Sequence, residues 1–279
     1  MAADPQREAR PFRGSAPYYV RGRLPYAPVL ADALARALNL DGRGRLLDVG
    51  CGPGVVALRL AHLFEGLVGV DLDPDMLAEA ERRAKEQGVT HARWVSARAE
   101  ELPAGLGRFR VATFGRSFHW MDPERVAPAV FDLLEPGGAL VLLFETGERA
   151  PEPAALRPHP PPPRAAIEEL LQQYLGSERW TAHARRLGRQ DERARVLDRA
   201  GFVGPEQVHA IGRETFVRSA DDVIAFFYSY SHAAPHLFGA RLAEFEADVR
   251  RVLADASPSG LFCEESRDTD ALIWRKPGP

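Results

Sequence analysis

Between Gly44 and Phe144 the chain alternates short apolar runs with longer runs in which apolar positions recur at helical spacing. The short runs are mainly apolar and do not alternate residue by residue, which is typical of strands that helices cover on both faces. They are Arg45–Val49, Leu67–Val70, Ala92–Val95, Val111–Phe114 and Ala139–Phe144. This pattern predicts an α/β fold with a doubly wound parallel sheet.

The helical runs that connect these strands carry their own start and stop signals. They are Val55–Phe64, Pro74–Gln87 and Pro123–Leu134. Asp73 and Asp122 each precede a proline, so each carboxylate is expected to cap a helix whose first residue is that proline. The segment Leu134–Gly138 contains proline and two glycines, which predicts a turn before the fifth strand.

The rhythm changes after Glu145. Residues 151–163 contain seven prolines, which predicts a stiff, extended connection. An arginine-rich stretch from Arg164 to about Ala200 predicts a helix that ends at Gly201, and Pro205–Arg213 predicts a sixth strand.

The last part of the chain predicts two more helices and a closing strand. Ser219 to Asp222 is a capping sequence ahead of a helix over Val223–Tyr230. Ala271–Trp274 is the last apolar run and predicts the closing strand. The second helix has one apolar face, formed by Phe238, Leu242, Phe245, Val249 and Val252.

Composition narrows the class of protein. The chain has 279 residues, of which 45% are hydrophobic and 27% charged, with a net charge of −3. A core can therefore form, and a nucleic-acid stripe or a general attraction to anionic membranes is not expected. Cys51 and Cys263 are the only cysteines, so we expect neither a disulfide framework nor a cysteine-built metal cluster.

The first ten residues lack the apolar stretch of a secretion signal. The longest apolar run, Ala139–Phe144, is too short to cross a bilayer. The expectation is a cytoplasmic protein with no membrane partner. None of the histidine spacings predicts a metal site.

A glycine turn between the first strand and the first helix is the sharpest chemical feature. Gly50, Gly52 and Gly54 stand at alternate positions, where they allow a tight turn and close approach of a ligand. Asp71 ends the second strand 21 residues after Gly50, where a carboxylate can accept hydrogen bonds from both hydroxyls of a ribose. The combination predicts a ligand that contains a nucleoside.

Asp48 discriminates between nucleoside ligands. A dinucleotide would place its diphosphate over the turn, where a carboxylate just before the turn repels it. S-adenosylmethionine has a ribose, an adenine and a cationic amino group but no phosphate. The electrostatics therefore favour S-adenosylmethionine as the cofactor.

The segment from Leu46 to Gly54 resembles motif I of the class I S-adenosylmethionine-dependent methyltransferases, in the small-molecule branch called type 11. The resemblance covers about residues 16–146. It implies a mainly parallel, seven-stranded, Rossmann-like sheet with an inserted helical cap. It also implies that the cofactor contacts residues of the turn and of the second motif, namely Gly50, Cys51, Gly52, Gly54, Asp71, Leu72 and Met76.

The segment Ala97–Pro103 resembles the part of the family that lies beside the adenine edge. Arg98 stands where the family commonly has an aspartate that accepts a hydrogen bond from the adenine amino group. A guanidinium has no acceptor, so adenine recognition is expected to depend on the backbone of Ala99 and on Glu100.

The segment from Phe114 to Asp122 follows the fourth strand and is similar to the Ser/Ala-x-His-Trp segment of the same branch. The resemblance puts Ser117 at the cofactor and His119 where methyl donor and acceptor meet. Three roles for His119 stay open: general base, contact to the substrate, or structural residue.

The tyrosine-rich segment Pro17–Tyr26 resembles the family lead-in that folds over the bound cofactor. By that resemblance Arg23 pairs with the methionine carboxylate and Tyr19 lines the pocket. The alternative is a surface arm without ligand contact.

We therefore expect a methyltransferase that acts on an O, N or C nucleophile of a small molecule, for example in secondary metabolism. The alternatives are a cofactor-binding protein without catalysis, an NAD-dependent oxidoreductase on a similar fold, and a methyltransferase with a protein acceptor. Whether the protein is a monomer or a homo-oligomer stays open. The expected parts are an arm over the active site (1–30), the cofactor-binding core (31–147), a connection and helical cap (148–200), and the remaining strands with further cap helices (201–279).

Overall fold

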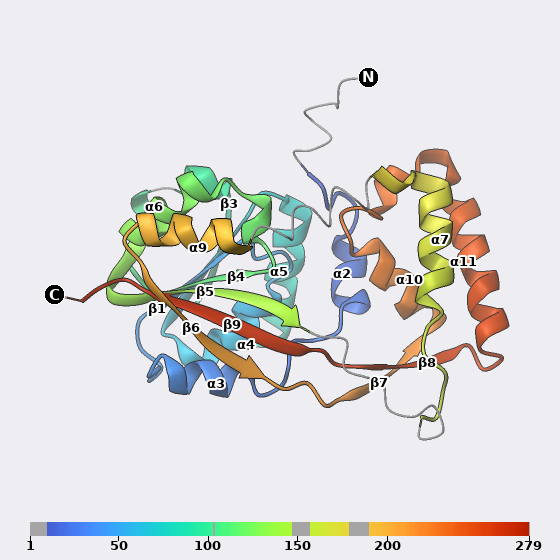
Figure 1. Ribbon diagram of the computed structural model, residues 1–279, viewed down its shortest axis with the longest axis horizontal. Helices are drawn as coiled ribbons and strands as arrows, with labels where there is room; N and C mark the ends of the chain where they lie inside the picture. Colours follow the sequence, from blue (N-terminus) through green and yellow to red (C-terminus); the bar gives the residue numbers. More distant parts are fainter. Residues whose placement is uncertain (1–9, 103, 147–156, 179–189, 279) are drawn as a thin grey trace. The chain divides into compact units, whose positions relative to one another are not determined.

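The computed structural model describes residues 10–102, 104–146, 157–178 and 190–278 (Figure 1). Contacts divide the chain into two units. The first, here called the sheet unit, comprises Tyr26–Thr146, Arg186–Ile211 and Asp268–Pro279. The second, here called the helical unit, comprises Met1–Pro25, Gly147–Arg185 and Gly212–Arg267.

The sheet unit contains a seven-stranded sheet with the order β3-β2-β1-β4-β5-β9-β6. The pairs among β1 to β5 are parallel, whereas β9 runs antiparallel to both β5 and β6. The strands are β1 Arg45–Val49, β2 Gly66–Asp71, β3 Ala92–Ser96, β4 Phe109–Gly115, β5 Leu134–Thr146, β6 Val203–Ala210 and β9 Asp268–Arg275. The prediction of a mainly parallel, seven-stranded sheet is confirmed.

Three helices of the sheet unit, those that begin at Val55, Pro74 and Pro123, begin where the sequence predicts. Asp73 and Asp122 each accept a hydrogen bond from a backbone N–H of the first turn at 3.0 Å, so both caps are confirmed. The α-helices are α3 Leu30–Ala37, α4 Val55–Leu60, α5 Pro74–Glu86, α6 Pro123–Leu133 and α9 Gln190–Arg199. Short 3₁₀ segments are η1 Ala61–Leu63, η2 Ala99–Glu101, η3 Ala104–Leu106 and η4 Phe118–Trp120.

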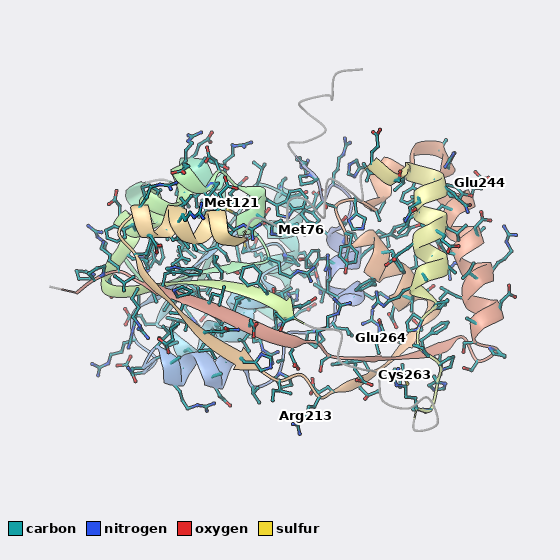
Figure 2. The ribbon with its side chains drawn as sticks, in the orientation of Figure 1. Met76, Met121, Arg213, Glu244, Cys263 and Glu264 are labelled. Carbon is teal, nitrogen blue, oxygen red and sulfur yellow. The ribbon has the colours of Figure 1, made fainter. Side chains whose placement is uncertain are left out.

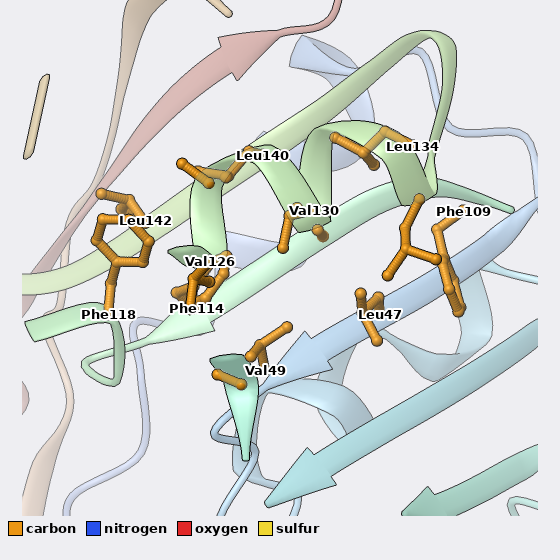
Figure 3. Close-up of a cluster of buried hydrophobic side chains, with 14 of the residues drawn as sticks. Leu47, Val49, Phe109, Phe114, Phe118, Val126, Val130, Leu134, Leu140 and Leu142 are labelled. Atoms are coloured by element: carbon orange, nitrogen blue, oxygen red, sulfur yellow. The ribbon is translucent and has the colours of Figure 1, made fainter. Parts of the chain in front are cut away.

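Helices cover both faces of the sheet, and this explains the apolar runs. On one face α6 packs over Leu47, Leu140 and other strand residues (Figure 3), and α9 contributes to the same cluster. On the opposite face α3 and α4 pack over Leu46 and Val141 (Figure 1). Successive residues of one strand point to opposite faces, so both must be apolar when both faces are buried.

The helical unit has its own apolar core, to which α7, α10 and α11 contribute. Its elements are α2 Ala16–Gly22, α7 Arg164–Leu175, β7 Thr215–Ser219, α10 Ala220–Tyr228, η6 Pro235–Leu237, η7 Gly239–Arg241, α11 Leu242–Ala256 and β8 Leu261–Glu265. Ser219 and Asp222 form the expected capping box at the start of α10. Glu264 of β8 is buried and pairs with Arg164 and Arg218 (Figure 2).

The structure corrects several sequence predictions. The single helix from Arg164 to Ala200 is wrong, because α7 ends at Leu175 ahead of Gly176, whose φ is +82°. The α9 helix belongs to the sheet unit, so the expected division at residue 200 does not match the contacts. The antiparallel pair of β7 and β8 was not predicted.

Two further segments differ from expectation. The strand β5 begins at Leu134, which already pairs with Phe109, and the expected turn at Leu134–Gly138 is a register shift within the strand. Gly137, with φ at +78°, provides the local reversal. In the proline-rich connection, residues 157–163 form neither helix nor strand, and residues 151–156 lie outside the described residues.

Candidate functional site

The carboxyl ends of β2, β1 and β4 lie next to one another along one edge of the sheet unit. The chain passes from β1 to β2 and β3 on one side and to β4 and β5 on the other. Such a switch point leaves a crevice outside the strand ends, which is where open α/β sheets bind ligands. The glycine turn and the segment after β4 both begin at this edge.

The glycine turn depends on residues without a Cβ atom. Gly50, Gly52 and Gly54 have φ angles of +68°, +52° and +72°. The N–H groups of Gly50 and Cys51 donate to the carbonyl of Val70 at 2.7 and 3.0 Å, so the turn is bonded to the end of β2. A Cβ atom on Gly52 would meet no atom within 4 Å, so space is open beside the backbone there.

Asp71 connects the end of β2 to the turn. Its Oδ2 atom accepts a hydrogen bond from the Gly52 N–H at 2.8 Å, and its Oδ1 atom accepts one from the Asp73 N–H at 2.8 Å. Burial raises the pKa of Asp71, and the two N–H donors oppose this shift. Each carboxylate oxygen can accept a further hydrogen bond, so Asp71 can still receive two ligand hydroxyls.

Asp48 lies beneath the turn and is 1% exposed. Its Oδ2 atom accepts from the Ala57 N–H of α4 at 3.1 Å, and its Oδ1 atom accepts from the Thr113 hydroxyl at 2.8 Å. Burial raises the pKa of Asp48 to about 7, and the charge of Asp71 adds to the shift. Because Asp48 is almost fully buried, this geometry favours an action of Asp48 on a ligand through its charge over direct contact.

The loop after β4 packs against the glycine turn. The Ser117 hydroxyl donates to the carbonyl of Val49 at 2.5 Å, so this side chain holds the loop on β1. A Cβ atom on Gly50 would lie 2.5 Å from the Ser117 Cβ atom and 2.9 Å from the Cε atom of Met121. The turn and the loop therefore fit together only because residue 50 is glycine.

His119 is half-buried in η4, two residues beyond Ser117. Its ring centroid lies 5.4 Å from that of Trp120, with the ring planes tilted by 42°. The structure thus brings His119 to the same edge as the glycine turn. Its role stays a prediction.

The residues expected to pack on adenine differ in accessibility. Leu72, directly after Asp71, is 37% exposed. Met76 on α5 is only 2% exposed. Leu72 is therefore the one of the two that offers apolar surface to a ligand.

The segment expected at the adenine edge is held by Glu100. Its Oε1 atom accepts from the Asp122 N–H at 2.9 Å, and its Oε2 atom lies 3.6 Å from the Arg98 Nε atom. Ala99 is 7% exposed. Glu100 therefore connects the segment after β3 to the loop after β4.

Tyr19 and Arg23 belong to the helical unit, so their expected contact with the cofactor stays a prediction. The Arg23 Nη2 atom donates to the Ser229 carbonyl at 3.2 Å. Its guanidinium carbon lies 3.9 Å from the ring centroid of Tyr230 and 5.3 Å from that of Tyr19.

Two supporting residues were not predicted from the sequence. The Thr113 hydroxyl in β4 donates a hydrogen bond to Asp48, and the ring of Trp94 in β3 packs against Gly69 of β2. A Cβ atom on Gly69 would lie 2.3 Å from the Trp94 ring and 3.0 Å from the Cys51 sulfur. The sequence of one strand does not reveal the register in which it pairs with its neighbours, so these contacts could not be predicted. The one available signal was Gly69, because a glycine within an apolar strand indicates that another group approaches the backbone closely.

The described part of the chain gives no support for a reactive thiolate or a metal site. Burial, with Asp71 and Asp48 close by, raises the pKa of the Cys51 thiol well above its usual value, so this cysteine stays a neutral thiol. Among the described residues, histidine, cysteine and carboxylate side chains form no group of three suited to a metal ion. The helices that are described include none with the length and apolarity needed to span a membrane.

Sequence comparison identifies relatives of the sheet unit. Residues 46–138 match the family described as "Methyltransferase domain". An uncharacterized methyltransferase of Mycobacterium tuberculosis is 35% identical over 128 residues, which are 46% of this chain and 49% of that protein. A ubiquinone biosynthesis O-methyltransferase of Methylococcus capsulatus is 38% identical over 127 residues, 44% of this chain and 51% of that protein. The chain spans about half the length of these curated relatives.

Solved structures resemble the whole chain at the level of fold. The YcgJ protein of Bacillus subtilis has a TM-score of 0.50 and 16% identity, and the match covers 89% of this chain and 98% of that one. The [4+2]-cyclase SpnF has a TM-score of 0.51 and 20% identity, with 98% and 94% covered. One neighbour is thus named for a cyclisation, so the fold by itself does not determine the reaction.

Gly50→Ala and Gly52→Ala separate backbone strain from steric conflict. Both place alanine in a left-handed conformation, which costs about 1–2 kcal/mol. Only the Gly50 variant also drives a methyl group into Ser117 and Met121, so it is expected to lose about 1–3 kcal/mol more in denaturant unfolding. In the Gly50→Ala background, Ser117→Gly should restore part of this loss. Equal destabilisation by the two single variants would contradict the packing of turn and loop.

Proposed function

We propose that the chain, whose residues 46–138 match the family described as "Methyltransferase domain", is a class I S-adenosylmethionine-dependent methyltransferase and that it methylates a small molecule. The observation that carries the proposal is the position of Asp71. Its carboxylate joins the end of β2 to the Gly52 N–H, beside an open stretch of backbone. A ribose with two free hydroxyls fits such a carboxylate.

The charges at the turn support S-adenosylmethionine over a dinucleotide. Asp48 lies at the amino end of α4, where a dinucleotide would need a place for its diphosphate. When ionised, this carboxylate repels phosphates and attracts the ammonium group of S-adenosylmethionine. An NAD-dependent oxidoreductase is therefore the weaker alternative.

The reaction is a single displacement: the acceptor attacks the methyl carbon, the bond to sulfur breaks, and S-adenosylhomocysteine leaves as a neutral thioether. Asp71 and the glycine turn would hold the nucleoside, and the loop at Ser117 would fix its neighbour His119 at the same edge. The enzyme would contribute mainly alignment and exclusion of water. Where the acceptor carries a proton, His119 is the proposed residue to receive it.

The names of two relatives agree with a small-molecule acceptor. They are the ubiquinone biosynthesis O-methyltransferase and a demethylmenaquinone methyltransferase of Thermus thermophilus, which is 33% identical over 134 residues. A protein that binds the cofactor without methyl transfer remains the second candidate, since the cyclase shares the fold. Transfer of a labelled methyl group separates the two.

Asp71→Ala should weaken binding of S-adenosylhomocysteine at least tenfold, or by ~1.4 kcal/mol, because the ribose loses its acceptor. Isothermal titration calorimetry measures this, with Asp75→Ala as a control two residues into α5. The wild type should bind S-adenosylhomocysteine and not NAD. Unchanged affinity in Asp71→Ala, or preferential binding of NAD, would contradict the proposal.

Asp48 predicts the pH dependence of binding. With its pKa raised to about 7, Asp48 is largely protonated in the free protein at pH 6. A nearby ammonium favours the ionised carboxylate, so binding should release up to about one proton at pH 6, and affinity should rise as the pH increases through 7. Calorimetry in buffers of different ionisation enthalpy measures the proton release. Asp48→Asn should abolish it; equal release by both proteins would rule out this role.

Kinetics can distinguish a general base at His119 from a residue that only positions the substrate. The acceptor is first identified by transfer of a labelled methyl group to a panel of phenols, carboxylic acids and amines. If His119 is the base, His119→Ala should reduce kcat by a factor on the order of 10²–10⁴ and remove the acid limb of the pH profile. Cofactor affinity should not change, and the exposed His62 provides a control as His62→Ala. A loss below about fivefold would leave only a positioning role.

A further inference from the structure

An ion pair joins the carboxyl ends of β4 and β5 in the sheet unit. The Arg116 Nη1 atom lies 2.6 Å from the Glu145 Oε2 atom. The two side chains are 23% and 18% exposed, so the pair is largely buried yet reachable from the surface. Neither residue takes part in the cofactor contacts described above.

The backbone of Arg116 is unusual. Among the described residues with a Cβ atom, only Asn39 and Arg116 have a positive φ, and that of Arg116 is +56°. Asparagine tolerates this region, whereas a long side chain adopts it rarely. Such strain at a strand end is a feature of functional sites and is maintained by surrounding structure. Here the Arg116 N–H donates to the carbonyls of Phe114 and Leu143 at 3.1 and 3.2 Å.

The order of the strands places this pair relative to the proposed cofactor site. Along the edge, β2 ends in Asp71, β1 ends in the glycine turn, β4 is followed by Arg116, and β5 carries Glu145 near its end. If the nucleoside lies over β2 and β1, the ends of β4 and β5 are left for the methyl acceptor. Ser117, next to Arg116, is bonded to Val49 of β1, so the two regions adjoin.

The donors of Arg116 suggest what the acceptor carries. Glu145 offsets the charge of the guanidinium, so a preference for an anion comes from the N–H groups that do not face Glu145. Arginine has five N–H donors in a planar fork, and it can pair with a second carboxylate or a phosphate while it stays on Glu145. Glu145 then serves to orient the guanidinium.

We propose that Arg116, oriented by Glu145, binds an anionic group of the methyl acceptor, so that the acceptor is a small molecule with a carboxylate or a phosphate. This inference rests on the proposed function. It assigns to Arg116 the selection of the substrate and leaves proton transfer to other groups.

The test uses the full chain saturated with S-adenosylhomocysteine and three probes of similar size: benzoate, phenyl phosphate and neutral benzyl alcohol. Calorimetry should give at least about tenfold tighter binding for one of the anions than for benzyl alcohol. Whether benzoate or phenyl phosphate binds more tightly distinguishes a carboxylate acceptor from a phosphate acceptor.

Three variants distinguish anion binding by Arg116 from a purely structural role of the Arg116–Glu145 ion pair. Arg116→Gly suits the left-handed backbone, so its thermal unfolding should stay close to that of the wild type while the preference for anions disappears. Glu145→Gln keeps an acceptor for Arg116 but removes the competing charge, so it should bind the anions severalfold more tightly. Arg82→Gln, which removes an exposed arginine paired with two glutamates on α5, should change neither property.

The inference would be overturned if the wild type bound the anionic and neutral probes equally, or if the preference for anions persisted in Arg116→Gly. Normal binding of S-adenosylhomocysteine in the same experiment would leave the proposed function intact. A large loss of stability in Arg116→Gly without a change in anion preference would make the pair a clamp between β4 and β5. Failure of the wild type to bind S-adenosylhomocysteine would overturn both.

Discussion

The hydrogen bonds that Asp71 accepts from Gly52 and Asp73 connect the end of β2 to the glycine turn that follows β1. Three residues of that turn have left-handed backbones, so the turn cannot shift without losing these bonds. The rest of the site depends on it, because Ser117 and Met121 pack directly on Gly50. The carboxylate therefore stabilises the fold of the turn, and on the proposed function the same two oxygens receive the ribose hydroxyls.

Burial of a second carboxylate gives the edge its electrostatic character. Asp48 provides a capping acceptor for the first turn of α4, whose N-cap residue Gly54 has no side chain. Burial raises the pKa of Asp48 to about 7, so a charged ligand that binds nearby changes the ionisation of this carboxyl group. A cation is favoured at β1 and β2, whereas at β4 the charge of Arg116 is offset by Glu145. The proposal that Arg116 binds an anionic group of the methyl acceptor would give this edge two regions of opposite preference.

Local signals predicted the sheet well. The continuous apolar runs predicted β1 with its observed bounds, and the Asp-Pro pairs predicted the starts of α5 and α6. Gly176 interrupts the stretch that was taken as one helix, because a left-handed glycine ends α7. The β7 and β8 strands are five residues each and hold buried polar side chains such as Arg218 and Glu264, so their composition does not favour strands.

The residues of the site were predictable where they belong to a motif of fixed spacing. Gly50, Gly52 and Asp71 follow a spacing that the strand–turn–helix unit determines. Arg116 and Glu145 are 29 residues apart and meet only because β4 and β5 pair in one register, and the left-handed backbone of Arg116 has no local signal. The hydrogen bond from Thr113 to Asp48 was not predicted for the same reason, since Thr113 is on another strand.

The position of the nucleoside is the central claim, and a crystal structure of the protein with S-adenosylhomocysteine measures it most directly. The account predicts both ribose hydroxyls within hydrogen-bond distance of Asp71 and the sulfur atom on the β4 side of the glycine turn. Electron density for the ligand elsewhere, or a ribose that faces away from Asp71, would contradict it.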